Sequence, residues 1–324
     1  MHALILGAAG MIGRRLTDAL AAGGEAKALT LVDVVEPTAP AGFTGSVVTA
    51  SADLSVAGAA EAALIGRPDV IFHLAAIVSG EAEADLEKGY RVNLDATRML
   101  FDAIWRAHVA EGYRPRVVFT SSLAVFGPPL PGVIRDDMIL TPATSYGTQK
   151  AMGELLLADY TRRGFLDGIG LRLPTICVRP GKPNKAASGF FSGIIREPLA
   201  GHEAILPVPD TVRHWFASPR SATEYLLHAA RIDLAPLGLR RNLTMPGLSV
   251  TVGEMIAALG RVAGDKAVSL IRREPDPVIV KIVAGWPRDF EPKRALSLGF
   301  KAEPDMDTII RAHVEDELGG RIGG

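Results

Sequence analysis

Short, mostly apolar segments alternate with longer helical patterns along the first half of this chain. The apolar segments, typical of buried strands, are Ala3–Leu6, Leu29–Val32, Val47–Ala50, Val70–Leu74, Arg116–Thr120 and Ile169–Leu173. The helical patterns between them are Met11–Ala22, Ala57–Ile65, Leu86–His108 and Ser145–Arg163. Strands without a polar face that are separated by helices indicate a parallel sheet covered on both faces. The sequence therefore predicts an α/β fold built on a doubly wound parallel sheet, with right-handed crossovers.

The character of the sequence changes after Arg179, where a polar, proline-broken loop begins. Later elements are predicted to be less regular: a strand at Asn242–Met245 and helices at Val252–Val262 and Thr308–Glu317. We expect a first domain of residues 1–178, onto which the segment of about 212–235 packs back. Residues 179–324 are expected to form a smaller C-terminal lobe over the strand ends, where open α/β sheets bind ligands.

Composition argues against several classes of function. The net charge of −1 gives no general attraction to nucleic acid or to an anionic membrane. No apolar run reaches the roughly 18 residues that span a bilayer, and the N-terminus has no basic segment of a signal peptide. The single cysteine, Cys177, excludes an internal disulfide, and no His, Asp or Glu spacing indicates a metal site. We expect a cytoplasmic protein without a metal.

A glycine-rich segment lies between the first predicted strand and the first predicted helix. It contains Gly7, Gly10, Met11, Ile12 and Gly13. Small residues let the backbone turn sharply and approach a pyrophosphate, which the N-terminus of a helix attracts. With the strand on one side and the helix on the other, the motif predicts a Rossmann-type dinucleotide site.

Asp33 bears on which dinucleotide binds. It ends the second predicted strand, 20 residues after Gly13, where a carboxylate hydrogen-bonds the ribose hydroxyls of the adenosine. A carboxylate also repels a 2′-phosphate, so we expect NAD. Arg14 and Arg15 argue in the opposite direction, for a dinucleotide with a 2′-phosphate, because either could reach that phosphate. That they are solvated residues of a first helical turn is the simpler interpretation.

Tyr146 and Lys150 are the predicted centre of the chemistry. Residues four apart share one face of a helix, so the phenol and the ammonium project to the same side. A nearby cation stabilises a phenolate, and a pKa lowered by ~2–3 units corresponds to roughly 3–4 kcal/mol. Ser122 ends the strand upstream and brings a hydroxyl to the same edge of the sheet.

The chain resembles the extended short-chain dehydrogenase/reductases, the group that contains the nucleotide-sugar epimerases and dehydratases. The resemblance rests on the glycine segment, Asp33, Ser122, Tyr146 and Lys150, together with Asp53, Leu54, His73, Leu74, Ala75, Ala76, Asn93, Arg172, Leu173 and Pro174. It implies that Tyr146 takes the proton of the substrate hydroxyl, that Ser122 orients the oxygen, and that Lys150 binds the nicotinamide ribose. It also implies that Asp53 and Leu54 flank the adenine, Ala75 and Ala76 the phosphate–ribose region, and Pro174 the carboxamide, with Asn93 mainly structural.

Three features depart from the nucleotide-sugar enzymes. Leu123 and Ala124 stand where the dehydratases carry an acidic pair, Thr175 where the epimerases have Asn, and Gly189 where an Asn opens a helix. The segments 72–80, 172–185 and 212–215 instead resemble the members that oxidise D-erythronate. That resemblance implies oxidation of a small sugar acid at C2 to the 2-oxo acid with NAD. The alternatives are a nucleotide-sugar 4-epimerase with bound NAD and a non-catalytic NAD(P) sensor.

Several side chains are candidates to bind such an acid. They are Ser79, Ser122, Thr175, Arg179, Lys185 and Arg213, with Lys182 and Arg220 as further cations. A carboxylate favours a fork-like cation. His73 is interpreted as a buried strand residue rather than a base, Cys177 as inert packing, and His214 is left open between the two roles. The resemblance also implies a homodimer through the helices near 86–108 and 145–163.

Overall fold

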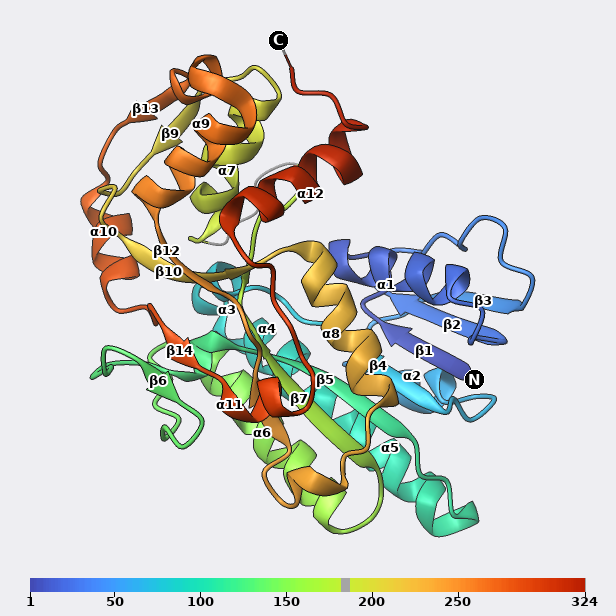
Figure 1. The fold of residues 1–324 in the computed structure, drawn as a ribbon. Helices are drawn as coiled ribbons and strands as arrows, with labels where there is room; N and C mark the ends of the chain where they lie inside the picture. The colour runs from blue at the N-terminus through green and yellow to red at the C-terminus, as the bar shows by residue number, and fades with distance from the viewer. Residues whose placement is uncertain (182–186, 324) are drawn as a thin grey trace. The chain divides into compact units, whose positions relative to one another are not determined.

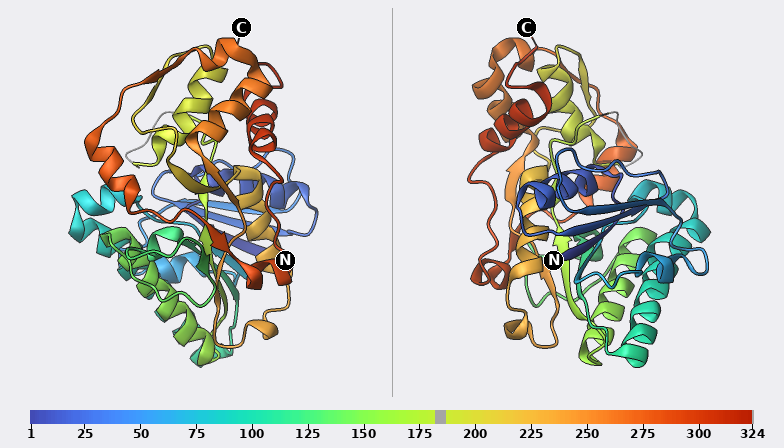
Figure 2. Two further views of the ribbon diagram at one scale, coloured as in Figure 1. Left: turned by 60° about the vertical axis from the view of Figure 1, so that its left-hand side comes forward. Right: turned by 90° about the vertical axis from the view of Figure 1, so that its right-hand side faces the viewer.

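The computed structural model describes residues 1–181 and 187–323, and the chain divides into two compact units. Unit 1 comprises residues 1–125, 144–173 and 223–244, and unit 2 comprises residues 126–143, 174–222 and 245–324. Figures 1 and 2 trace the chain through both units.

Unit 1 is built on a seven-stranded sheet in the order β11-β7-β5-β4-β1-β2-β3. Its strands, all paired in parallel, are β1 (His2–Leu6), β2 (Ala28–Asp33), β3 (Ser46–Ser51), β4 (Val70–His73), β5 (Arg116–Ser122), β7 (Asp167–Leu173) and β11 (Asn242–Thr244). The winding direction reverses between β1 and β4, which is where open α/β sheets bind ligands. The prediction of a doubly wound, Rossmann-type α/β fold is confirmed.

Helices cover both faces of this sheet (Figure 1). The α-helices are α1 (Met11–Ala22), α2 (Ala59–Ala63), α3 (Ser79–Ala84), α4 (Leu86–Tyr90), α5 (Ala96–Glu111), α6 (Ser145–Arg162) and most of α8 (Pro219–Arg231). Short 3₁₀ turns lie at Leu123–Val125 and Ala235–Leu237. The helices α5 and α6 lie side by side, and Phe101, Phe119 and Leu157 meet in the core between these helices and the sheet.

The helix expected over 86–108 is not continuous. A π-helical turn, η1 (Arg91–Asp95), separates α4 from α5 and contains Asn93. Such turns widen a helix locally and occur often at functional sites. Two residues before Tyr146, α6 is capped by Thr144, whose side chain accepts a hydrogen bond from the Gly147 amide at 3.1 Å.

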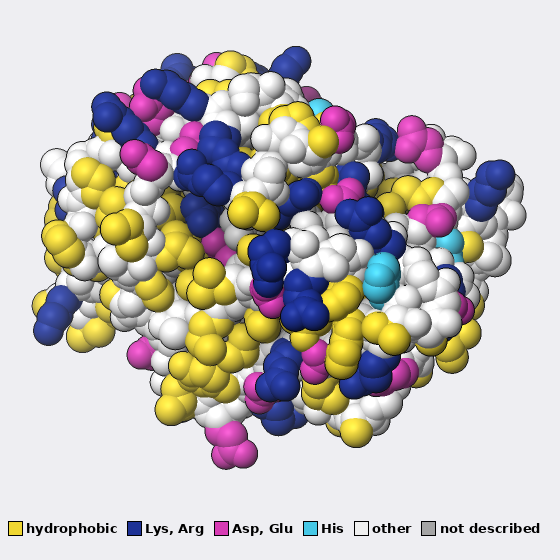
Figure 3. All heavy atoms as spheres, turned by 90° about the horizontal axis from the view of Figure 1, so that it is seen from below, with side chains coloured by type: hydrophobic (Ala, Val, Ile, Leu, Met, Phe, Trp, Pro, Cys, Tyr) yellow, Lys and Arg dark blue, Asp and Glu magenta, His cyan; other side chains and the backbone are white. Residues whose placement is uncertain are grey.

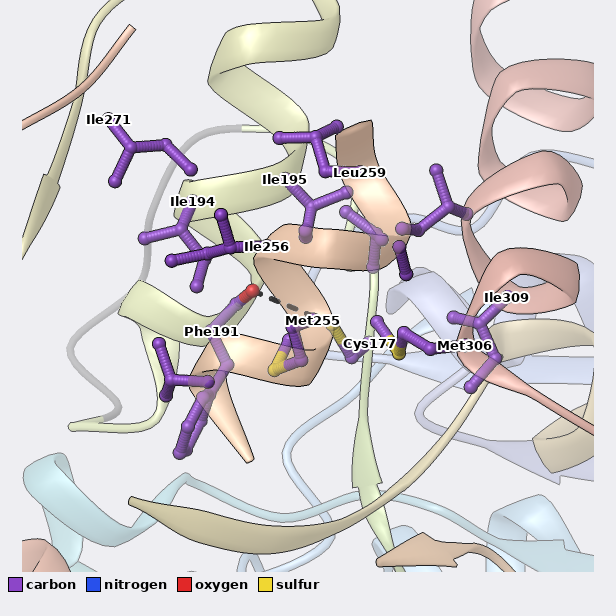
Figure 4. Close-up of a cluster of buried hydrophobic side chains, with 14 of the residues drawn as sticks. Cys177, Phe191, Ile194, Ile195, Met255, Ile256, Leu259, Ile271, Met306 and Ile309 are labelled. Atoms are coloured by element: carbon purple, nitrogen blue, oxygen red, sulfur yellow. Dashed lines mark hydrogen bonds between the residues drawn. The ribbon is translucent and has the colours of Figure 1, made fainter. Parts of the chain in front are cut away.

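Unit 2 combines small sheets with a helical core. The strands β8 (Thr175–Ile176), β10 (Arg213–Ala217) and β12 (Leu248–Thr251) form one sheet, and the pairs β9 (Ala204–Leu206) with β13 (Ile271–Arg273) and β6 (Ile134–Arg135) with β14 (Phe290–Glu291) form two others. The helices are α7 (Gly189–Leu199), α9 (Val252–Val268), α10 (Pro277–Ala284), α11 (Lys293–Ser297) and α12 (Met306–Leu318). Figure 4 shows side chains of α7, α9 and α12 meeting around Cys177 in a hydrophobic core.

The observed division differs in three places from the two domains expected from the sequence. The first segment of unit 1 ends at Val125, and residues 126–143 belong to unit 2. The domain boundary expected near residue 178 lies instead at Leu173. The returning segment is 223–244 rather than about 212–235. The strand expected at Asn242–Met245 belongs to unit 1 rather than to the smaller lobe, because β11 pairs with β7 through its backbone and becomes the edge of the main sheet.

The structure also bears on membrane insertion, metal binding and attraction to nucleic acid, which the sequence argued against. None of the described helices is long and apolar enough to cross a membrane. Within the described part of the chain, no group of three His, Cys, Asp or Glu residues could hold a metal ion. On the face shown in Figure 3, basic side chains lie beside acidic ones, so no single sign of charge covers it. The cytoplasmic location stays a prediction.

Candidate active site

Lys150 joins α6 to the end of β5. Its ammonium donates a hydrogen bond to the Thr120 carbonyl at 2.9 Å, two residues before Ser122. The same nitrogen lies 5.8 Å from the centre of the Tyr146 ring and 5.0 Å from that of Phe119. The structure therefore places Lys150 beside Tyr146 and beside the end of β5, the strand whose last residue is Ser122, and Tyr146 and Ser122 are both half-buried.

Burial defines the electrostatics of Lys150. Its side chain is only 2% exposed, and burial lowers its pKa to about 8, with the Glu154 carboxylate acting in the opposite direction. The ammonium remains the main form at neutral pH, and a cation in dry surroundings acts strongly on a neighbouring phenol. A positive charge therefore lies beside the Tyr146 ring.

Ser122 is oriented by the turn that follows it. Its oxygen accepts a hydrogen bond from the Ala124 amide at 3.2 Å. Because the oxygen is the acceptor in this contact, the hydroxyl proton of Ser122 is available to donate to a substrate oxygen.

His73 is part of the core next to this site. Its Nε2 lies 2.9 Å from the Thr97 hydroxyl, which itself donates to the Asn93 carbonyl at 2.9 Å. Thr97 must therefore accept from His73, so the ring proton lies on Nε2. Burial, and then the charge of Lys150, lower the His73 pKa to about 3. A neutral ring with this partner acts as a packed strand residue and not as a base.

The turn between β1 and α1 has no room for a side chain at Gly7 or at Gly13. A Cβ atom on Gly7, where φ is +90°, would lie 2.8 Å from the Ala75 nitrogen, and one on Gly13 would lie 2.2 Å from the Gly7 oxygen. Gly10 stands at the N-cap of α1, followed by the half-buried Met11 and Ile12. The backbone amides at this helix end suit the pyrophosphate of a dinucleotide.

Asp33 ties this turn to the end of β2. Its carboxylate accepts a hydrogen bond from the Ala9 amide at 3.0 Å and a longer one from Val35 at 3.4 Å. The half-buried carboxylate fits a ribose diol, which donates hydrogen bonds, better than a 2′-phosphate. Arg14, one of the two opposing cations, is exposed on α1. These residues fit NAD.

Asp53 has a partner that the sequence did not indicate. Its carboxylate accepts from the Ser55 hydroxyl at 2.6 Å and from Arg91 of η1 at 3.1 Å, and the Ser55 contact is the largest cause of a pKa below the ordinary value. Leu54 is 6% exposed and packs into the core of unit 1. The sequence does not indicate the role of Arg91, because its contact with Asp53 depends on the π-helical turn that contains it.

Asn93 holds the segment that follows β4. Its amide accepts from the Ile77 nitrogen at 2.9 Å and donates to the Ile77 oxygen at 3.2 Å. It also donates to Gln149 at 2.8 Å, a fully buried residue directly before Lys150 that sequence reasoning missed. This clamp fixes the chain between Ala75 and Ile77, which leads to the half-buried Ser79 at the start of α3.

In unit 2, Thr175 is bonded to His214. Its hydroxyl lies 2.7 Å from Nε2 of the histidine, whose Nδ1 lies 2.8 Å from the Pro287 carbonyl. Burial lowers the pKa of His214 to about 4, although the Pro287 bond opposes this, and the ring stacks on Phe191 at 5.4 Å. A carbonyl only accepts, so Nδ1 carries the proton of the neutral ring. Thr175 must then donate to Nε2, and its remaining lone pairs can only accept.

The candidate cations of unit 2 are placed as follows. Arg179 donates to the Ser188 hydroxyl at 2.6 Å, and its carbonyl accepts from Arg196 at 2.7 Å. Arg213 donates to the Ser249 carbonyl at 2.7 Å and pairs with Glu254, while Arg220 pairs with Glu315 and Asp316. Lys182 and Lys185 lie outside the described residues. Pro174 begins the segment of unit 2 that contains Thr175.

Comparison with known proteins adds an independent line of evidence. Residues 3–216 match the model of the NAD dependent epimerase/dehydratase family. A D-erythronate dehydrogenase of Cupriavidus necator is 47% identical over 98% of both chains. Another, from Haemophilus influenzae, is 41% identical over 98% of this chain and all of its own. A crystal structure described as a nucleoside-diphosphate-sugar epimerase from Agrobacterium tumefaciens is 63% identical, with a TM-score of 0.97 over 99% of this chain and 95% of its own.

Proposed function

This chain belongs to the NAD dependent epimerase/dehydratase family and is an NAD-dependent oxidoreductase, and from that premise we propose that it oxidises D-erythronate at C2 to 2-dehydro-D-erythronate. The observation that carries the reaction type is the buried Lys150 ammonium held between Tyr146 and the end of β5. The substrate rests on similarity to two D-erythronate dehydrogenases along almost their whole length.

In the proposed reaction, Tyr146 removes the proton from the substrate hydroxyl as the carbon loses its hydride. Lys150 stabilises the phenolate, and Ser122 donates a hydrogen bond to the substrate oxygen and so holds it in place. NAD, when bound, supplies the nicotinamide that accepts the hydride. The residues that would hold NAD are Gly7, Gly10, Gly13, Asp33, Asp53, Leu54, Ala75, Ala76 and, through its backbone, Pro174.

Thr175 supports a polyhydroxy substrate. In the chain it follows Leu173 by two residues, and Leu173 is the register partner of Ser122. Because its own proton is committed to His214, the Thr175 oxygen offers only lone pairs. A substrate hydroxyl donates to such an oxygen, whereas a carboxylate or a carbonyl cannot. We therefore assign Thr175 to a hydroxyl of the sugar acid.

The carboxylate of the acid needs a cation. We propose Arg179 as the first candidate, because it follows Thr175 by four residues along the chain. The guanidinium of Arg179 donates a hydrogen bond to the Ser188 hydroxyl at 2.6 Å. A fork-like guanidinium can bind a carboxylate through two hydrogen bonds.

A nucleotide-sugar 4-epimerase is the second candidate. It is favoured by the description of the Agrobacterium tumefaciens structure, which shares 63% of its residues with this chain. Thr175 argues against it, because this position has lost the amide that the epimerases carry there. A non-catalytic NAD(P) sensor would not need Ser122, Tyr146 and a costly buried Lys150.

The decisive experiment compares substrates. Purified protein with NAD is offered a panel of four- and five-carbon sugar acids, and NADH is followed by its absorbance. We expect the fastest turnover with D-erythronate, and slower turnover with acids that differ at C2 or C3. If none of the acids produced NADH while a UDP-sugar was epimerised, the dehydrogenase proposal would be wrong.

The proposed function includes a homodimer. Trp105 and Val109 of α5 are 40% and 69% exposed, and Met152 and Leu155 of α6 are 39% and 68% exposed. Each pair lies on one face of its helix, and the two helices are neighbours. Exposed apolar side chains that are grouped in this way mark interaction surfaces, and we propose that a second copy of the chain covers them.

A further inference from the structure

Glu154 is a carboxylate at the centre of a buried polar network in unit 1. It is only 1% exposed. Arg172 of β7 binds it with two hydrogen bonds, Nε to Oε1 at 2.9 Å and Nη2 to Oε2 at 2.7 Å. The hydroxyl of Ser121 on β5 donates to Oε1 at 2.5 Å. Ser121 and Arg172 are register partners in the sheet, so one carboxylate joins α6 to two adjacent strands.

The network continues the contacts of Lys150. Lys150 and Glu154 are one turn apart on α6, so their side chains share a face. Lys150 binds the carbonyl of Thr120, and Glu154 binds the hydroxyl of the next residue, Ser121. The residue after that is Ser122. Two successive turns of α6 therefore hold the strand end that presents Ser122.

Charge adds a second effect. The titratable groups around Lys150 are His73 on β4 and Tyr146 and Glu154 on α6, with Arg172 of β7 acting through Glu154. His73 is neutral. The Glu154 carboxylate raises the pKa of Lys150 against the effect of burial. Without it the buried ammonium would lose its proton at a lower pH.

We propose that Glu154 is a positioning residue for the reaction, which keeps Lys150 in its charged form and holds the Ser122 end of β5 at the level of Lys150 and Tyr146. This inference rests on the proposed dehydrogenase function. Buried ion pairs are seldom more stabilising than apolar side chains of the same volume, so folding alone gives this chain little reason to keep a carboxylate and a guanidinium there.

The test compares two variants that affect different parts of the network. Glu154→Gln removes the charge and keeps the size, whereas Ser121→Ala removes the hydroxyl and keeps the charge. The pH profile of kcat/KM for the sugar acid is measured from about pH 6 to about pH 10. We expect the alkaline limb to move down by at least about half a pH unit in Glu154→Gln. In Ser121→Ala we expect kcat to fall a few-fold, with the limb in its original place.

The proposal is overturned if the alkaline limb of Glu154→Gln stays where it is in the wild type. A purely structural role predicts that both variants lower activity equally at every pH. If Glu154→Gln does not fold, the double variant Glu154→Met/Arg172→Met replaces the pair by apolar side chains of similar size, and the same downward shift is expected.

A second readout needs no substrate. A lysine whose pKa is lower in the folded than in the unfolded chain makes stability rise with pH above its folded pKa. In denaturant unfolding at a series of pH values, we expect this rise to begin at lower pH in Glu154→Gln than in the wild type, and to be absent in Lys150→Met. An identical onset in wild type and Glu154→Gln would contradict the inference about Glu154. Failure of the sugar acid to react would instead contradict the proposed function and leave this measurement intact.

Discussion

At the scale of single residues, Lys150 connects function with a cost in stability. Its pKa is brought to about 8 because the ammonium is removed from water and offered one carbonyl as a direct partner. At neutral pH the cation is retained, and holding it in the core costs on the order of a few kcal/mol of folding free energy. Its charge lies beside Tyr146, which we propose as the base.

The variant Lys150→Met tests this cost. The folded pKa lies below the unfolded one, so the cost of the buried ammonium is fully present below about pH 8 and disappears as pH rises from about 8 to the unfolded pKa. We expect the free energy of unfolding of the wild type, relative to Lys150→Met, to rise by about 1–3 kcal/mol between about pH 7 and about pH 10. Denaturant unfolding measures this difference. A difference that does not vary with pH would show that Lys150 titrates normally.

Tyr146→Phe tests the proposed base. Deleting the phenol oxygen removes the proton acceptor, so we expect kcat to fall by about 10²–10⁴-fold with NAD affinity within a few-fold of the wild type. Steady-state kinetics and calorimetric NAD titration check both. Tyr160→Phe is the matched control: Tyr160 is on the same helix and loses only its hydrogen bond to Asp102, so its kcat should stay near that of the wild type. Near-normal turnover of Tyr146→Phe would remove the residue from the mechanism.

Thr175→Val tests the acceptor role of Thr175, because valine keeps the shape and removes the oxygen. We expect KM for D-erythronate to rise by about 10-fold, the value of one hydrogen bond. A simple 2-hydroxy acid with no further hydroxyl should be affected much less. Equal effects on both acids would mean that Thr175 does not bind a substrate hydroxyl.

At the scale of elements, the turn between β1 and α1 is the most restricted part of the cofactor site. Gly13 belongs to α1, and its hydrogen stands where a Cβ atom would meet the backbone of Gly7 and Ala8. Gly193 is also a helical glycine, but it faces open space on α7. Replacing glycine by alanine should therefore disturb the cofactor site at Gly13 and stabilise the helix at Gly193.

Gly13→Ala should displace the turn and weaken NAD binding by at least about 10-fold. Gly193→Ala should leave the NAD dissociation constant unchanged and raise stability by about 0.5–1 kcal/mol, because alanine favours the helix. Calorimetry and thermal unfolding measure both quantities. The cradle described for the dinucleotide would be wrong if Gly13→Ala folded and bound NAD normally.

Elements with strong local patterns could be predicted from the sequence. β1, β4 and β5 are mostly apolar because both faces of the sheet are covered, and α1 and α6 follow from their periodicity and their strand-end context. Asn93 was noted, but its π-helical turn was not, because a single inserted residue leaves no periodic trace. Gln149 and Glu154 were overlooked for a similar reason: polar residues on a helix usually face solvent, and only the packing of α6 against the sheet buries these two.

At the scale of the whole molecule, the limits of sequence reasoning follow from strand length. Unit 2 uses strands such as β8 and β14, of two residues each, whose pairing depends on distant partners rather than on a local pattern. β11 is also short, with three residues, and for this reason the sequence assigns it to the smaller lobe although it pairs with β7 in the main sheet. Residues that follow from a backbone constraint, such as Gly7 and Gly13, or from a short spacing on one helix, such as Tyr146 with Lys150, could be predicted. The bond between Thr175 and His214 could not, since it depends on a tertiary contact between positions 39 apart in sequence.

The state of assembly is the property of the whole molecule that the helix surfaces predict. Four apolar side chains on α5 and α6 remain exposed in a single copy, and burying them against a second copy removes them from water. We expect light scattering to give twice the chain mass of 34.3 kDa. Leu155→Lys places a charge in this face and should shift the protein toward monomers. Leu239→Lys, equally exposed at 70% but outside these helices, should remain dimeric. A lysine buried in an apolar contact loses hydration that nothing on this face replaces, which is why Leu155→Lys should break the dimer. A monomeric wild type would exclude the proposed dimer, and a dimer unaffected by Leu155→Lys would place its interface elsewhere.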